Sequence, residues 1–313
     1  MAVYIFKRIK GLMVVIFLVL TIAFMIMRLD PGNSAALMLG LEANAEDSAA
    51  LRAQLGLDRP ILVQYRTFVF NSVKSDLGTS IFFNQPVTDV LWGRAEPTRS
   101  LSLFSLLIAL VIATPIGIYA ACRCGSWLDQ SAISTAMLAA AIPSFWTGLM
   151  FQRYLATELG WFPASGYGGP DAGFWTRMGH LALPSIVLGI VNSAFIIRFT
   201  PASMLDILGE DYIRTARSKG MGESRVILRH ALKKAVIPIS TVAGLTFALL
   251  VSATVVTGRV FNIPGMGNLI VSAVLHRDYP IIQGTLIVVA TLYVLLNFAT
   301  DLLYLLVDKR VKY

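Results

Sequence analysis

The sequence contains few charged residues for its length. Charged residues make up 14% of the 313 residues, whereas an ordinary soluble domain has about 25%. Hydrophobic residues account for 56%, and the mean hydropathy is +0.69. This composition excludes a disordered chain, a collagen-like chain and a disulfide scaffold. A soluble enzyme of this size could not bury so much apolar surface, so the composition favours a polytopic membrane protein.

Cysteine and histidine are also scarce. The two cysteines, Cys122 and Cys124, have no second pair and no histidine nearby, so they do not form a zinc motif. The histidines His180, His230 and His276 are far apart in the sequence, and none belongs to an H-E-x-x-H motif. Neither G-x-S-x-G nor the phosphate-binding G-x-x-x-x-G-K-[ST] occurs. We therefore expect no catalytic, cofactor-binding or metal residues, and no ATP binding without a partner subunit.

Six apolar runs are long enough to cross a membrane, since a hydrocarbon core of about 30 Å requires about 20 residues. The runs are 9–27, 101–121, 131–151, 180–197, 235–258 and 280–306. The first is longer than the apolar part of a signal peptide and lacks a cleavage site, so we expect an uncleaved helix. Prolines inside later runs predict kinks: Pro115, Pro143, Pro184 and Pro238. The sequence predicts an all-α membrane protein with six transmembrane helices, forming a single domain over 1–313.

Ionisable side chains are missing from the central parts of these runs. Proton- or sodium-coupled transporters usually carry carboxylates or histidines within the membrane. Their absence argues against a self-powered transporter, although backbone carbonyls can bind sodium. A stand-alone secondary transporter or channel remains the alternative, while a membrane-embedded enzyme lacks any cluster of acid, base and nucleophile.

Basic residues indicate the orientation in the membrane. The net charge is +8, which fits the excess of Lys and Arg in cytoplasmic loops better than it fits nucleic-acid binding. Segment 198–234 holds eight of these residues, and the tail holds Lys309, Arg310 and Lys312. We therefore expect cytoplasmic termini, a cytoplasmic loop at 198–234 and an external loop at 28–99. Helical spacing at 48–55 and 61–73 predicts that the external loop forms a small ordered cap.

The cytoplasmic loop contains the most informative stretch. Residues 211–219 begin with an acid and end with cations, which suits the dipole of a short helix. Gly220, expected at positive φ, and Gly222 end that helix. A second, amphipathic helix follows, leads into the fifth run and could lie along the membrane surface. The pair could act as a rigid element that transmits motion, or simply as a basic loop that follows the charge rule.

The cytoplasmic loop and several other segments resemble those of a known family. Residues 211–220, D-Y-I-R-T-A-R-S-K-G, resemble the coupling-loop signature of ABC importer permeases of the dipeptide/oligopeptide/nickel family. Aligned on Gly220, the general pattern E-A-A-x-x-x-G falls on Arg214, Thr215 and Ala216. Further matches occur in order at 55–60 with Gln64-Tyr65, 76–80, 142–146, 180–184, 260–267, 277–280 and 301–304. The match is closest to the first of the family's two permease subunits.

Two positions depart from the family pattern. Gly258, followed by Arg259, stands where the family often has Glu, and Asp308-Lys-Arg310 stands where Asp-Pro-Arg is common. The first change removes an acid near the outer end of the fifth run. Neither departure lies in the coupling loop.

The resemblance implies a type I ABC importer in the bacterial cytoplasmic (inner) membrane. The implied partners are a second related permease, an extracytoplasmic solute-binding protein and two cytoplasmic ATPase subunits that bind ATP and Mg. Peptides are the expected substrate, with nickel, glutathione or an opine-like compound as alternatives.

The resemblance also implies site residues. Docking to an ATPase subunit is expected at Asp211, Tyr212, Arg214, Thr215, Ala216, Arg217, Lys219 and Gly220. An uncharged polar path for the substrate is expected at Asn192, Ser193, Ser252, Thr254 and Thr257. The alternative for these five residues is helix packing, in which small and hydroxylated side chains are favoured.

Overall fold

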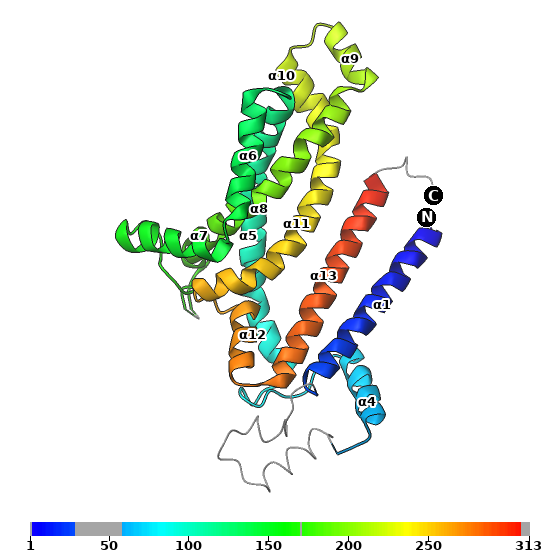
Figure 1. Cartoon of the computed structure of the whole chain (residues 1–313), viewed down its shortest axis with the longest axis vertical. Helices are drawn as coiled ribbons and strands as arrows, with labels where there is room; N and C mark the ends of the chain where they lie inside the picture. The colour runs from blue at the N-terminus through cyan, green and yellow to red at the C-terminus, as the bar shows by residue number, and fades with distance from the viewer. Residues whose placement is uncertain (1, 29–57, 170, 308–313) are drawn as a thin grey trace. The chain divides into compact units, whose positions relative to one another are not determined.

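The computed structural model describes residues 2–28, 58–169 and 171–307, and these are helical apart from turns and one antiparallel bridge between Thr79 and Pro86. The chain divides into two compact units. Unit 1 comprises Met1–Glu96 and Gly265–Leu295, and unit 2 comprises Pro97–Pro264 and Leu296–Tyr313. Figure 1 labels the helices. They are α1 (Ala2–Ile26), α4 (Ile61–Val73), α5 (Val87–Cys122), α6 (Trp127–Ala141), α7 (Ser144–Phe151), the π-helix η1 (Gln152–Glu158), α8 (Phe174–Leu208), α9 (Asp211–Ser218), α10 (Glu223–Arg225), the π-helix η2 (Val226–Ala231), α11 (Leu232–Val260), α12 (Met266–Leu275) and α13 (Tyr279–Val307).

The predicted membrane fold is confirmed. Five helical stretches are long and apolar enough to cross a membrane: Phe6–Ile26, Val87–Cys122, Phe174–Leu208, Glu223–Val260 and Tyr279–Thr300. A sixth span requires α6 to be counted together with α7 and η1. Several helices extend well beyond the predicted runs: α5 begins at Val87 instead of 101, and α8 covers Phe174–Leu208 instead of 180–197.

The predicted span 131–151 is not one straight helix. It is broken into two helical pieces, namely α6 and the continuous pair α7–η1. The axis of the second piece is bent by 89° from the axis of α6. Pro143 explains the break, because it lacks an N–H and forces the preceding residue out of the helical region. Ile142 accordingly has an extended backbone, with φ −83° and ψ 126°.

The predicted loops are also more helical than expected. In 198–234, α8 continues to Leu208 and the helix of α10, η2 and α11 begins at Glu223, so only 209–210 and 219–222 lie outside helices. The segment before α11 is therefore continuous with that helix. In the predicted external loop, α4 matches the expected helix at 61–73, and α5 begins at Val87. The helix expected at 48–55 lies outside the described residues.

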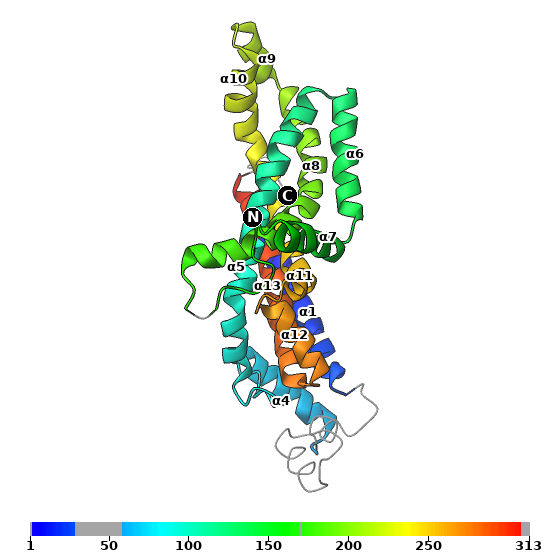
Figure 2. The same ribbon diagram turned by 90° about the vertical axis from the view of Figure 1, so that its left-hand side faces the viewer.

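Unit 2 is held together by close packing around α8, which lies between α6 and α11 (Figure 2). Glycines let α5 and α8 approach each other. A Cβ at Gly189 would lie 2.6 Å from Cγ2 of Ile108, and a Cβ at Gly117 would lie 2.5 Å from Cβ of Thr200. Close approach at small residues such as glycine is typical of helices that pack within membranes.

Unit 1 combines two apolar clusters with polar contacts between segments distant in sequence. The Tyr65 hydroxyl lies 2.8 Å from the Thr21 hydroxyl, and its ring packs edge-on against Phe24 with centroids 5.1 Å apart. The Gln64 amide oxygen accepts a hydrogen bond from Arg28. Gln64 and Tyr65, which belong to one of the family-like motifs, therefore hold α4 against α1 and the residues that follow it.

Candidate coupling and translocation site

The helix α9 is amphipathic and packs one face against its own unit. Ile213 is fully buried and Ala216 is 7% exposed. Both belong to one apolar cluster with Met204 of α8 and with Val226 and Ala231 of η2. A helix of eight residues is too short to be stable alone in water, so this packing holds α9 in place.

The end of α9 confirms the conformation expected for Gly220. The amide of Gly220 donates to the Arg217 carbonyl at 2.9 Å, and the amide of Met221 donates to the Ala216 carbonyl at 3.4 Å. Gly220 has φ +76°, a conformation that glycine adopts readily and other residues rarely adopt. A Cβ at Gly220 would have no atom within 4 Å. The constraint on this position within the chain is therefore conformational and not steric.

An ion pair closes the turn between α9 and α10. Arg217 donates to both carboxylate oxygens of Glu223, from Nη2 at 2.6 Å and from Nε at 3.1 Å. Its hydrogen bonding to the Glu223 carboxylate raises the pKa of Arg217 above its ordinary value. Nearby, the ammonium of Lys234 lies 4.1 Å from the ring centre of Tyr212. Burial, and then the charge of Glu210, raise the pKa of the Tyr212 hydroxyl.

The predicted docking residues therefore divide into two groups. Tyr212, Ala216 and Arg217 contact their own unit and hold α9 in position. The others form an exposed face of the segment: Asp211, Arg214, Thr215, Lys219 and Gly220. Sequence reasoning missed Ile213 as an anchor and Glu223 as the partner of Arg217. Ile213 could have been found from its helical spacing, because it is an apolar residue three positions before Ala216. ATPase docking itself stays a prediction.

The five residues predicted to line the substrate path do not share one surface. The side chains of Asn192, Ser193 and Thr254 donate to carbonyls of their own helices, at 2.8, 2.7 and 2.6 Å. Thr257 is fully buried and makes no hydrogen bond to any described residue, while Ser252 is exposed. Ser193, Thr254 and Thr257 lie within the helix packing of unit 2. Their role in a path stays a prediction.

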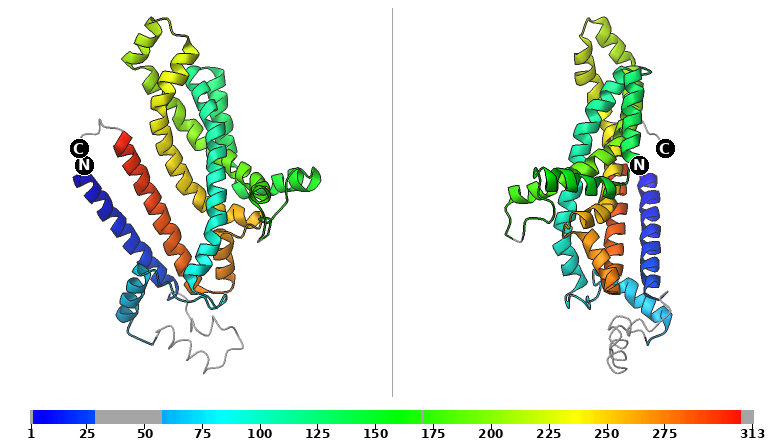
Figure 3. Two further views of the ribbon diagram at one scale, coloured as in Figure 1. Left: turned by 180° about the vertical axis from the view of Figure 1, so that it is seen from behind. Right: turned by 60° about the vertical axis from the view of Figure 1, so that its left-hand side comes forward.

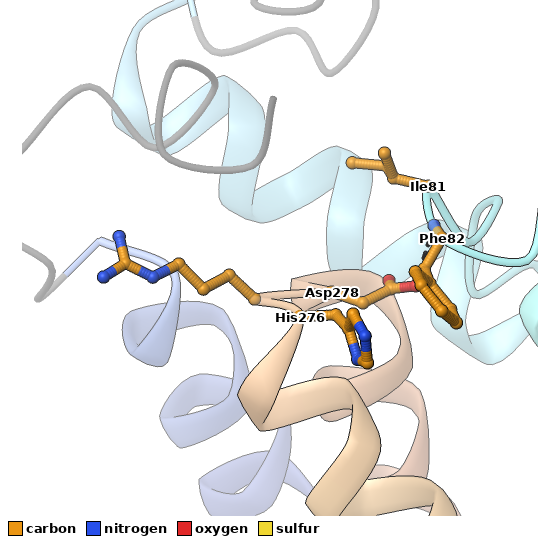
Figure 4. Close-up of a pocket in the computed structure, with 5 residues that line it drawn as sticks. Ile81, Phe82, His276 and Asp278 are labelled. Atoms are coloured by element: carbon orange, nitrogen blue, oxygen red, sulfur yellow. Dashed lines mark hydrogen bonds between the residues drawn. The ribbon is translucent and has the colours of Figure 1, made fainter. Parts of the chain in front are cut away.

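In unit 1, two of the matched motifs meet around a buried carboxylate. Asp278 is 2% exposed. Its Oδ2 accepts from the Ser80 hydroxyl at 2.5 Å and from the Phe82 amide at 3.2 Å, and its Oδ1 accepts from the Ile281 amide at 3.3 Å. Figure 4 shows the adjacent rings of Phe82 and His276, whose centroids are 4.0 Å apart. Together with Ile81 and Arg277 they line a shallow pocket of about 290 Å³.

No part of this arrangement resembles a catalytic centre. Among the described residues, no group of three or more His, Cys, Asp or Glu side chains could hold a metal ion. The Asp278 carboxylate is occupied by backbone and hydroxyl donors, so its role is to fix the turn before α13. The arrangement is instead that of a helical membrane unit with a short, exposed connecting helix, α9.

Comparison with protein families identifies the chain. Residues 113–313 match the family described as the binding-protein-dependent transport system inner membrane component, and residues 1–102 match its N-terminal component. The chain belongs to this family. It is a permease subunit of an ABC importer.

The permease has close relatives over its full length. It is 38% identical to the dipeptide transport system permease protein DppB of Alkalihalophilus pseudofirmus and 37% identical to the probable peptide ABC transporter permease protein y4tP of Sinorhizobium fredii, each match covering 100% of both chains. It is 37% identical to the glutathione transport system permease protein GsiC of Escherichia coli (strain K12), over 99% of both chains.

A solved structure shows the same fold. The permease resembles a chain of the inward-facing MetNI methionine ABC transporter with a TM-score of 0.59 and 18% sequence identity, over 70% of the permease and 97% of that chain. The type I importer fold expected from the sequence is thereby confirmed.

Proposed function

We propose that the permease forms half of the translocation path of a peptide importer in the bacterial cytoplasmic membrane. The observation that carries this proposal is the full-length similarity to permeases named for dipeptide, peptide and glutathione transport. The proposed assembly contains a second permease, two ATPase subunits that bind ATP and Mg, and an extracytoplasmic solute-binding protein.

The exposed face of α9 is the proposed contact with an ATPase subunit. Its helix dipole is matched by Asp211 at the start and Arg217 in the last turn. Anchoring through Ile213 and Ala216 would carry a displacement of α9 into α8 and η2, because all three share the apolar cluster. ATP-driven closure of the ATPase subunits would thereby move the helices of unit 2.

The substrate can be tested on the assembled importer. The complex of both permeases and the ATPase subunits, reconstituted in vesicles with its solute-binding protein, should accumulate a labelled dipeptide when ATP is supplied. Uptake of glutathione without uptake of dipeptide would assign the permease to glutathione, and uptake of nickel alone would overturn the peptide proposal. ATP hydrolysis by the isolated permease would overturn the assignment of ATP chemistry to the partners.

The proposed orientation has its own test. In a variant with Cys122→Ser and Cys124→Ser, we expect Lys74→Cys to react with a membrane-impermeant thiol reagent in intact spheroplasts, and Ser224→Cys to react only after lysis. Both residues are exposed in the structure. The reverse pattern would place the termini outside.

A further inference from the structure

A second pocket lies within unit 1, where α1, α4 and the start of α13 meet. Figures 1 and 3 show α4 beside the end of α1, near the first turns of α13. The pocket has a volume of about 250 Å³. Its charged lining residues are Arg28, Arg59 and Asp76, and its apolar ones include Met27 and Phe68. A pocket that combines both charges with apolar walls suits a ligand that has charged and apolar parts.

The pocket lies at the ends of two helical stretches that are long and apolar enough to cross a membrane. The first is Phe6–Ile26 of α1, and Arg28 follows it by two residues. The second is Tyr279–Thr300 of α13, whose fifth residue, Gln283, also lines the pocket. The Gln283 amide donates to the Ala23 carbonyl of α1 at 2.9 Å, so the two ends are held together. The pocket therefore lies where both helices reach the membrane surface, at the level of the lipid headgroups.

Arg28 is half-buried and has no acidic partner in the pocket. Its Nη1 donates to the Phe24 carbonyl at 2.9 Å, its Nη2 donates to Oε1 of Gln64, and its guanidinium carbon lies 3.5 Å from the centre of the Phe24 ring. These contacts fix the group and occupy only part of its five N–H donors. Among the residues that the structure describes, no carboxylate forms an ion pair with Arg28. Burial lowers the pKa of Arg28, because the cation loses water, and a bound anion would offset that loss.

Asp76 supplies the opposite charge at the same pocket. Its Oδ1 accepts a hydrogen bond from the Gly78 amide at 3.1 Å, and its Oδ2 accepts none from any residue that the structure describes. The side chain is exposed. Arg28 and Asp76 therefore match a zwitterion whose anionic group lies at the arginine and whose ammonium group lies at the aspartate.

The surface of α1 next to the pocket favours a lipid over a soluble zwitterion. Leu18, Ile22 and Met25 are 52%, 56% and 41% exposed, and their i, i+4, i+7 spacing places them on one face of the helix. All three belong to the apolar stretch that can cross the membrane, and Arg28 lies on the turn after Met25. Hydrocarbon chains can therefore lie along this face while the headgroup reaches the pocket.

We propose that this pocket binds a phospholipid whose headgroup carries a primary ammonium group, as phosphatidylethanolamine does. The phosphodiester accepts hydrogen bonds from Arg28 and Arg59, and the ammonium group donates to Asp76. A guanidinium suits the first contact because it presents paired N–H donors to phosphate, and basic pockets between membrane helices are known sites for lipid headgroups. Phosphatidylcholine cannot make the second contact, because its quaternary ammonium has no N–H. The bound lipid holds α1, α4 and α13 together, whichever substrate the importer transports.

The test measures lipid binding by the assembled importer. The complex is depleted of lipid in detergent and titrated with phosphatidylethanolamine, and bound lipid is counted by native mass spectrometry. We expect Arg28→Gln to weaken the tightest binding event at least about tenfold, because charge-assisted hydrogen bonds are lost. The matched control is Arg66→Gln, which removes an exposed arginine of α4 that does not line the pocket and should leave binding unchanged.

Asp76→Asn tests the headgroup in a variant that keeps the local fold. Asparagine retains the oxygen that accepts from the Gly78 amide but removes the charge. The wild type should bind phosphatidylethanolamine severalfold more tightly than phosphatidylcholine, and Asp76→Asn should bind the two lipids equally. A preference that survives in Asp76→Asn would contradict the ammonium contact.

Two further results would overturn the proposal. Equal lipid binding by Arg28→Gln and the wild type, with both shown to be folded by thermal unfolding, would show that the guanidinium holds no phosphate. Glycerophosphoethanolamine has the same headgroup without acyl chains and should bind at least about tenfold more weakly than the lipid; equal affinity would assign the pocket to a soluble zwitterion. Dipeptide uptake by the same variants in vesicles tests the proposed function separately.

Discussion

Two short helices, α12 and α9, each connect long helices in this permease. The charged residues in these two connections differ in burial. In unit 1, α12 is followed by Asp278, whose carboxylate is buried and accepts three hydrogen bonds from its own unit. In unit 2, α9 buries only Ile213 and Ala216 and leaves its charged residues exposed. A connection that buries its charge among its own donors is a fixed structural turn, whereas the ion pairs of α9 stay at the surface, where a partner could reach them. The comparison therefore distinguishes a structural turn from a segment whose exposed charges suit the proposed contact with an ATPase subunit.

Removing the buried carboxylate should have the largest effect on stability. Asp278→Ala leaves the Ser80 hydroxyl and the amides of Phe82 and Ile281 without their acceptor. Hydrogen bonds to a charged group are worth about 1.5–3 kcal/mol each, and an unsatisfied buried group costs a similar amount. We expect a loss of several kcal/mol and little protein in the membrane, measured by thermal unfolding of the purified subunit. Ser80→Ala is the milder control, and an unchanged melting temperature for Asp278→Ala would show that the turn is not fixed by this residue.

A charge placed on the buried face of α9 should have the next largest effect on stability and transport. Ala216→Asp introduces a carboxylate among Ile213, Val226 and Ala231 with no partner in the cluster, which costs roughly 3 kcal/mol or more. We expect α9 to detach, so that transport and ATPase co-purification are lost while the subunit still inserts. Ala216→Ser, of similar size, should keep most activity. If Ala216→Asp transports normally, the buried face of α9 does not position it.

The two connections also differ in how far they could be predicted from sequence. The charge order of 211–219 and the two glycines were enough to predict α9 and the positive φ of Gly220, because these are local properties. The partnership of Ser80 and Asp278 joins residues 198 positions apart, and one sequence offers no local signal for it. The same limit applies to the break between α6 and α7: Pro143 predicted a kink, but the residues around it give no local signal for the angle of 89°.

Substitutions at Gly220 test whether transport requires the turn that ends α9. Because a Cβ there meets no atom within 4 Å, Gly220→Ala should add about 1 kcal/mol of backbone strain and Gly220→Val somewhat more. We expect both variants to insert, with transport reduced more by valine than by alanine. Stimulated ATPase activity measured beside uptake distinguishes lost coupling from lost assembly. Full transport in Gly220→Val would contradict a coupling role for the segment.

The smallest effect is expected from the ion pair between α9 and α10. Arg217 and Glu223 keep 42% and 56% of their side-chain surface exposed, and exposed pairs contribute about 0–1 kcal/mol because water screens them. Arg217→Ala and Glu223→Ala should therefore each lower transport only slightly, and less than Ala216→Asp. The double variant should equal either single one if the pair acts only on its own unit, because the second change removes a partner that is already lost. A much larger loss in Arg217→Ala than in Glu223→Ala would instead show that the guanidinium contacts an acid on the ATPase subunit. Arg217 would then belong to the residues that contact the ATPase subunit and not to those that position α9.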